Sequence, residues 1–315
     1  MLTFATFNVC NLGIDALPSR LERVATVISH ELQGPDVLAV QEIKATADND
    51  EGGVPADQAY RQLIEAIRAA DGPGYAVREV PPLKNQDGGQ AGANIRVGFL
   101  FNPRRIAFID RGEAGPEDAT GIHIVAGQPR LTLSPGRIEP RHPAFYGDPA
   151  HHWVPSRKAL AGEFRFGSVP IFVITCHLKS MRSTIRREQD YAKRQRHAQA
   201  AVIHRFVAGL LACDPSAAVV VLGDMNDLPG SKTLKILKGD LLINLLEDIA
   251  KGACYTRRHG GRPQALDHVL VSRRLRHGAS VRIPHINSDS ADPNRASDHD
   301  PVLVMLDPLN LAGMD

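Results

Sequence analysis

The sequence has few of the features that mark secreted or membrane-bound proteins. Its four cysteines form no C-x-x-C pair and no regular framework, which predicts reduced thiols. It has no apolar run of 18 residues, and a strand-like run begins almost at Met1, so we expect neither a membrane helix nor a signal peptide. A single tryptophan, Trp153, is little for a membrane anchor. These absences predict a cytoplasmic protein without a membrane partner.

The chain also lacks a strong charge of either sign. It has 37 basic and 35 acidic residues, a net charge of +2. Without a global cationic field, any case for nucleic acid as a partner must rest on local basic clusters.

Length and composition fit one α/β domain. The chain has 315 residues, and 43% of them are hydrophobic, enough for a substantial core. We therefore predict a single domain over residues 1–315. The stretch 111–155, rich in Gly, Pro, His and Arg, is interpreted as a long loop insertion, whose length favours a functional loop. The oligomeric state is not predictable from these data.

Three helices are predicted from apolar periodicity. The first has a capping box at Ser19-x-x-Glu22 and an apolar repeat that continues to Leu32. The others are centred on residues 60–67 and 184–211.

Polar motifs stand at the ends of short apolar runs rich in β-branched residues. Such runs are typical of strands buried on both faces. The motifs that follow a run are Asn8, Gln41-Glu42, His177 and Gly223-Asp224-Met225-Asn226. Asp267 and Asp298 instead precede the runs 269–271 and 302–306. If these last two strands are antiparallel to the others, all the polar ends meet at one edge of a mixed sheet, where ligands usually bind.

This ordered set resembles the endonuclease/exonuclease/phosphatase superfamily. Gly-Asp-x-Asn at 223–226, combined with Ser297-Asp298-His299 near the C-terminus, is a specific signal, and the resemblance extends from Thr3 to about Leu306. The superfamily includes deoxyribonucleases, apurinic endonucleases, neutral sphingomyelinases and inositol polyphosphate 5-phosphatases. The resemblance implies a four-layer α/β sandwich of two mixed β-sheets flanked by helices.

The resemblance places a metal ion on Glu42. A hard carboxylate suits Mg²⁺, with Mn²⁺ as a substitute, and Asn8 and Asp298 would complete the ligand set together with water. The alternative is that Glu42 is a solvated acid that ends a strand.

Asp224 is the expected general base, which takes a proton from the attacking water. Asn226 would orient that carboxylate or the phosphate. On an extended segment, residues 224 and 226 point to the same side and Met225 points away. The alternative is a tight turn, for which Gly-Asp and Asn-Asp-Leu-Pro-Gly are also typical.

His177 and His299 are the imidazoles expected to contact the scissile phosphate, one to stabilise its charge and one to protonate the leaving group. By resemblance, Asp267 would hydrogen-bond His299. The deoxyribonuclease branch has histidine at the position of His177, whereas apurinic endonucleases have tyrosine, which argues against abasic-site repair. His268 faces away from Asp267 and is interpreted as a packing residue.

Arginines are the candidates for substrate binding. Arg96 lies in a strand whose sequence resembles extracellular bacterial nucleases, and either faces solvent or binds a phosphate. Arg157 and Arg196 are further candidates; the latter belongs to a basic group at 182–196 that is either a solvated helix face or a backbone-phosphate contact.

Together these residues predict a Mg²⁺-dependent phosphoesterase, with a nuclease acting on DNA or RNA as the leading interpretation. A phosphodiesterase or phosphatase for a small or lipid phosphoester, of the sphingomyelinase or inositol-phosphate type, is the alternative. A non-catalytic scaffold ranks last, because Glu42, Asp224 and His299 are all present.

Overall fold

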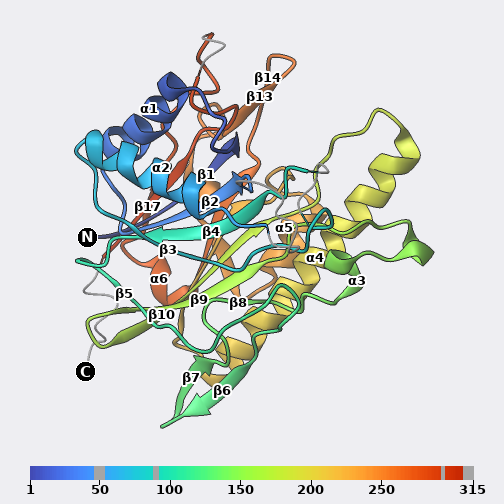
Figure 1. The fold of residues 1–315 in the computed structure, drawn as a ribbon. Helices are drawn as coiled ribbons and strands as arrows, with labels where there is room; N and C mark the ends of the chain where they lie inside the picture. The colour runs from blue at the N-terminus through green and yellow to red at the C-terminus, as the bar shows by residue number, and fades with distance from the viewer. Residues whose placement is uncertain (46–53, 88–91, 292–294, 308–315) are drawn as a thin grey trace.

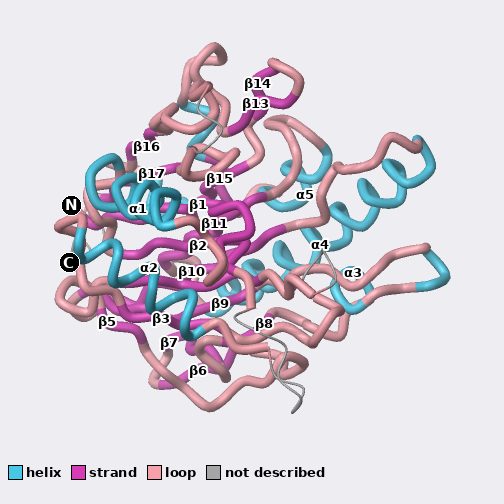
Figure 2. The backbone as a smooth tube through the Cα atoms, turned by 45° about the horizontal axis from the view of Figure 1, so that its top comes forward, coloured by secondary structure: helices cyan, strands magenta, loops and turns pink. Residues whose placement is uncertain are grey.

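Two mixed β-sheets pack face to face, with helices on their outer faces (Figure 1, Figure 2). The computed structural model describes residues 1–45, 54–87, 92–291 and 295–307. The architecture is the predicted four-layer α/β sandwich.

The first sheet has six strands, and its centre is the parallel pair β1 (Leu2–Leu12) and β2 (Val37–Ile43). β17 (Val302–Leu306) is antiparallel to β1, as the position of Asp298 predicted. The remaining strands are β16 (Ser280–Arg282) beside β17, β4 (Arg96–Phe101) beside β2, and β3 (Ala76–Glu79) at the edge.

The second sheet repeats this arrangement around the parallel pair β10 (Val169–His177) and β11 (Ala218–Asp224). β15 (Asp267–Ser272) is antiparallel to β11, again as predicted. The remaining strands are β12 (Leu242–Asn244), β9 (Leu160–Phe166), β5 (Ala107–Phe108) and β8 (Gly136–Arg137).

The core between the sheets is built mainly from buried apolar side chains. Phe4 and Phe99 from the first sheet pack with Phe164 and Val220 from the second, and each is 0% exposed. The rings of Phe99 and Phe164 meet edge to face at 5.5 Å. Burial of each such side chain contributes about 1.5–3 kcal/mol, which fixes the two sheets, and therefore their polar edges, against each other.

Helices cover the outer faces. The first sheet is covered by α1 (Pro18–Thr26), the π-helical turn η1 (Val27–Glu31) and α2 (Asp57–Ala69); the second is covered by α4 (Arg186–Cys213) and α5 (Lys232–Lys238). Short helical elements are α3 (Pro143–Tyr146), η2 (Pro149–His151), η3 (Leu245–Asp248) and α6 (Arg273–Arg276). Within the described ranges, none of the helices has both the length and the apolarity required to cross a bilayer.

The predicted capping box is wrong. α1 begins at Pro18, whose fixed φ suits the first helical position, and Leu17 is the N-cap residue. Ser19 therefore lies inside the first turn, where its hydroxyl accepts a hydrogen bond from Arg23 at 3.5 Å instead of capping the helix.

The segment 111–155 has secondary structure of its own. It contains the hairpin β6 (Ile122–Val125) and β7 (Gln128–Leu131), then β8, α3 and η2. Leu131, Ile138 and Phe145 are 0% exposed and join the core beneath α4. A second hairpin, β13 (Arg257–His259) and β14 (Arg262–Gln264), stands apart from both sheets.

Candidate active site

The carboxyl ends of the four central strands border one polar cavity of about 210 Å³. Glu42 lies near the end of β2 and His177 at the end of β10. Asp224 is the last residue of β11, and Asn226 lies just after it. His299, from the loop before β17, closes the cavity. The structure thus brings Glu42 and His299, which are 257 positions apart in the chain, to the same cavity.

Gly223 allows β11 to approach β10 at this edge. Its φ is +143°, and a Cβ there would lie 1.9 Å from the carbonyl oxygen of Cys176. Only glycine fits so close to a neighbouring backbone. The register pairs His177 with Asp224 as a result.

A β-bulge directs Glu42 into the cavity. The register between β2 and β4 shifts between Gln41 and Ile43, and Glu42 has a left-handed φ of +67°. Its carboxylate accepts hydrogen bonds from the backbone N–H of Asn11 and from the side-chain amide of Asn8, both at 3.1 Å.

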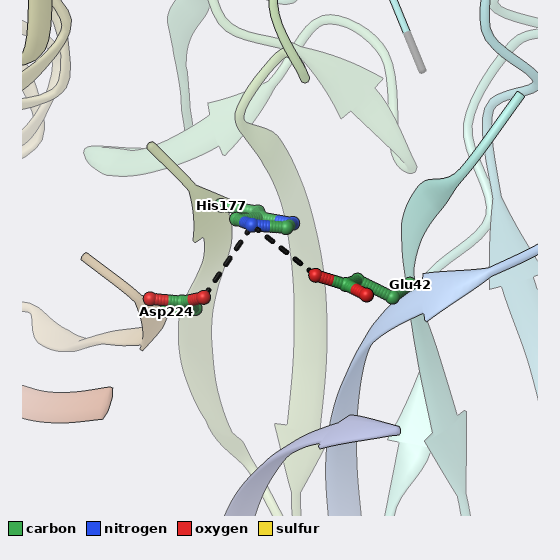
Figure 3. A group of neighbouring side chains, drawn as sticks. All are labelled: Glu42, His177 and Asp224. Carbon is green, nitrogen blue, oxygen red and sulfur yellow. Dashed lines mark ion pairs between the residues drawn. The ribbon is translucent and has the colours of Figure 1, made fainter. Parts of the chain in front are cut away.

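Glu42, His177 and Asp224 form a compact group across the two sheets (Figure 3). His177 Nε2 lies 3.4 Å from Asp224 Oδ2 and 3.8 Å from Glu42 Oε1. The Asn8 amide donates to both carboxylates, at 3.1 Å each. Two buried carboxylates and one imidazole, with ligand atoms within 4.8 Å of one another, are a donor set that fits a divalent cation.

Burial changes the protonation of this group. It raises the pKa of Asp224 to about 7, with a further contribution from the negative charge of Asp267. Burial and the positive charges of Arg157 and His299 hold the pKa of His177 well below its ordinary value. His177 is therefore neutral near pH 7, whereas Asp224 exchanges its proton in that range.

His299 and Asp267 form a buried pair on the other side of Asp224. His299 Nδ1 lies 2.7 Å from Asp267 Oδ2, which also accepts a hydrogen bond from the Thr256 hydroxyl at 2.6 Å. Burial by itself would lower the pKa of His299, but the carboxylate of Asp267, together with the charges of Asp224 and Asp298, outweighs it and raises this pKa to about 10. The imidazole is thus a cation at neutral pH. Since Nδ1 contacts Asp267, its Nε2 is the nitrogen that can contact a ligand in the cavity.

Asp298 does not join the group at Glu42. Its carboxylate lies 2.5 Å from a guanidinium nitrogen of Arg257. Burial raises its pKa, but His299 and Arg257 lower it more, so the net shift is downward. The neighbouring Ser297 fixes this loop, because its hydroxyl donates to the carbonyl of Asn8 at 2.6 Å.

Asp224 and Asn226 both border the cavity, but the predicted reason is wrong. β11 ends at Asp224, and Asn226 has a left-handed φ of +50°. Its backbone N–H donates to Asp224 Oδ1 at 2.9 Å, and its amide donates to the carbonyl of Leu178 at 3.1 Å. A tight turn, rather than an extended segment, places the two side chains together.

Of the three predicted arginines, one borders the cavity. Arg157 is 6% exposed, lines the cavity and donates to the Leu178 carbonyl at 2.9 Å. Arg196 is not among the residues that line the cavity. It pairs with Asp227 at 3.3 Å and donates to the carbonyls of Lys179 and Ser180. Its contacts position the loop after β10.

Arg96 lies elsewhere, contrary to both alternatives from the sequence. Its side chain is 0% exposed, pairs with Glu79 at 3.0 Å and donates to the Val54 carbonyl at 2.6 Å. It therefore faces neither solvent nor the catalytic cavity. His268 is a packing residue as predicted: its ring bonds Asn244 at 3.1 Å and the backbone of Asp227 at 3.0 Å.

Sequence reasoning missed several residues that line the cavity. Lys179 and Ser180 lie within three positions of His177, so their place after a motif strand was a usable signal; Arg182, which also lines the cavity, belongs to the predicted basic group at 182–196. Asn11 and Arg257 also line the cavity, and neither belongs to a matched motif.

The fold and this site are those of a class of phosphoesterases. Comparison with known proteins identifies the family. Residues 5–299 match the model of the Endonuclease/Exonuclease/phosphatase family, so the chain belongs to that family. It is accordingly a phosphoesterase, of a family that generally uses divalent metal ions. No curated protein matches the chain.

Solved structures share the fold at low identity. A D. rerio TDP2 humanized by 14 mutations aligns with a TM-score of 0.58 and 16% identity, covering 97% of this chain and 98% of that one. A mannosyl-6-phosphatase from Bacteroides thetaiotaomicron aligns with 0.57 and 14%, covering 98% and 100%. The human Nocturnin catalytic domain, with bound sulfate, aligns with 0.56 and 15%, covering 97% and 94%.

Proposed function

We propose that the chain is a divalent-metal-dependent nuclease that hydrolyses phosphodiester bonds of DNA or RNA with a water activated by Asp224. The main support is the position of Asp224, whose pKa is raised to about 7, in a cavity that it shares with cationic side chains. A base that titrates near the working pH is the most effective one.

The cavity suits a phosphate anion. Arg157, Lys179, Arg182 and Arg257 line it, and His299 adds an imidazolium. Preorganised cations of this kind stabilise the charge that develops on phosphoryl oxygens in the transition state.

Glu42 would hold the metal ion, with Asn8 fixing its carboxylate. The fit rests on the donor set: the carboxylates of Glu42 and Asp224 and the neutral imidazole of His177 have ligand atoms within 4.8 Å of one another. When bound, Mg²⁺ or Mn²⁺ would neutralise charge on a phosphate oxygen. The predicted ligand Asp298 would have to leave Arg257 to take part.

The protein's own groups then carry the proton transfers. Asp224 accepts the proton of the attacking water as its oxygen bonds to phosphorus, while the Asn226 N–H holds the carboxylate in position. The bond to the leaving oxygen breaks, and His299 Nε2 supplies the proton that this oxygen needs. Asp267 keeps that ring oriented and charged.

The proposal is tested by hydrolysis of supercoiled plasmid, single-stranded DNA, RNA, bis(nitrophenyl) phosphate and nitrophenyl phosphate, with Mg²⁺, with Mn²⁺ and with chelator. Metal-dependent nicking that disappears in Asp224→Asn supports it. Cleavage confined to the monoester would overturn it in favour of a phosphatase.

Glu42→Gln is expected to raise the Mg²⁺ concentration for half-maximal activity by about tenfold or more, because one hard ligand oxygen is lost. The measurement is a metal titration of plasmid nicking. Glu65→Gln, an exposed position on α2, is the matched control and should titrate like the wild type. An unchanged titration in Glu42→Gln would remove Glu42 from the metal site.

Asp267→Asn is expected to lower the pH at which activity is lost on the alkaline side. In the wild type, three carboxylates keep His299 protonated up to about pH 10, and the charge of Asp267 contributes most of the three. Without this charge the pKa of His299 falls, so the active cationic form disappears at lower pH. The pH profile of kcat checks this, and identical alkaline limbs in both proteins would contradict it.

A further inference from the structure

Two further cavities open beside the catalytic cavity, on the two sides of the loop 178–185 that joins β10 to α4. The first, of about 540 Å³, lies between this loop with the start of α4 and residues 152–154. The second, of about 580 Å³, lies between the same loop and the β13–β14 hairpin. In Figure 1 the loop stands between that hairpin and α3.

Both cavities adjoin the catalytic one and share lining residues with it. The first shares Lys179 and Arg182 with it, and the second shares Arg182, Asn226 and Arg257. Their remaining walls differ, since they have only Arg182 and Ser183 in common. They therefore diverge from the point where the scissile phosphate would lie.

The first cavity, here called the tyrosine groove, presents flat and apolar groups. The ring of Tyr191 lies 4.9 Å from that of His152, at an angle of 33°, and the Arg194 guanidinium is 4.6 Å from its centroid. Val154 and Ile185, which also line it, are 50% and 56% exposed. The Tyr191 ring is half-buried and the His152 ring is exposed. Rings and guanidinium planes of this kind stack with nucleobases regardless of sequence.

The second cavity, here called the hairpin groove, combines cations and amides with the apolar side chains of Met181 and Leu266. Arg182, Arg257 and His259 line it together with Gln189 and Gln264, and none of its described lining residues is acidic. Guanidinium groups suit backbone phosphates, and amides suit sugar hydroxyls and base edges.

We propose that a single strand of nucleic acid crosses the catalytic cavity, with one nucleotide-sized group in the tyrosine groove and the next part of the strand in the hairpin groove. This deepens the proposed function and rests on it. Volumes of about 540 and 580 Å³ are in the range of small-ligand sites and leave room for such groups. Since the strand continues on both sides of the scissile bond, the enzyme cleaves internal bonds and requires no free end.

A circular single-stranded DNA and a linear one of the same sequence test this directly, with bis(nitrophenyl) phosphate as a substrate that reaches neither groove. Cleavage of the circle at a rate close to that of the linear strand is expected. If the linear strand is cut while the circle stays intact, the proposal that the strand crosses the cavity is wrong, but the proposed nuclease function is retained. If only the small diester is hydrolysed, the proposed nuclease itself fails.

Variants of the grooves provide the second readout. Tyr191→Ala should raise KM for the oligonucleotide by about tenfold through lost stacking, with kcat little changed. Tyr191→Phe should keep the wild-type KM, since the ring is kept. Gln264→Ala should raise KM, because an amide of the hairpin groove is lost. The matched control is Arg61→Ala, an exposed arginine on α2, which should behave as wild type. Equal KM values for wild type and Tyr191→Ala would remove the tyrosine groove from the proposal.

Discussion

Replacement of Asp224 by Asn is expected to lower kcat by about 10²–10⁴-fold, because the proposed general base is lost. The same change should not lower the free energy of unfolding at pH 8 in the presence of chelator. Burial and Asp267 raise the pKa of Asp224 from 3.8 to about 7. The folded protein therefore binds this proton more tightly than the unfolded chain, and its stability falls as the pH rises from 3.8 through about 7.

Above pH 7 the wild type carries the full cost of an ionised, buried Asp224, which Asn does not have. Steady-state hydrolysis and urea denaturation at pH 6 and pH 8 measure the two effects together. Asp15→Asn, at a surface carboxylate that is 68% exposed, is the matched control and should change neither quantity much. Full activity in Asp224→Asn would exclude this carboxylate from the mechanism.

Replacement of Gly223 by Ala is expected to destabilise the protein by about 4 kcal/mol, at the high end for a single substitution. The new methyl group would lie 1.9 Å from the Cys176 carbonyl oxygen, with the backbone nitrogen and carbon of Cys176 both at 2.9 Å. A backbone in the centre of a sheet cannot move aside as the end of a flexible side chain can. The separation of β10 and β11 would cost activity as well, because it parts His177 from Asp224.

Gly167→Ala separates the effect of conformation from that of contact. Gly167, in the turn between β9 and β10, also has a positive φ, +58°, but nothing within 4 Å of the position of a new Cβ. Only the left-handed conformation is penalised there, by about 1–2 kcal/mol. Denaturant unfolding of both variants decides the matter: equal losses would show that the close approach at Gly223 does not limit stability.

The strands and the convergence of their polar ends were predictable, because burial on both faces leaves apolar runs that stop where the chain reaches the cavity. The directions of individual side chains were not. Arg96 stands in a strand of the expected type, yet its partner Glu79 comes from β3, whose pairing with β4 has no local sequence signal. The same limit applies to Asp298, whose partner Arg257 comes from a separate hairpin.

Local backbone geometry was the other feature that the sequence did not predict. Glu42 and Asn226 both reach the cavity through left-handed residues, one at a bulge and one in a turn. For non-glycine residues this conformation is uncommon and is imposed by the surrounding contacts, so alternation along an ideal strand could not reveal it.

The docking of Ser297 on Asn8 has a consequence for the synthesis of the protein. A chain that emerges N-terminus first can pair β1 with β2 and β10 with β11 well before His299 is made. The imidazolium and the hydrogen bond that ties its loop to β1 come only with residues 297–299. A nascent or truncated chain that stops short of them therefore lacks the acid of the proposed mechanism, and hydrolysis is expected only once these residues and β17 have been added.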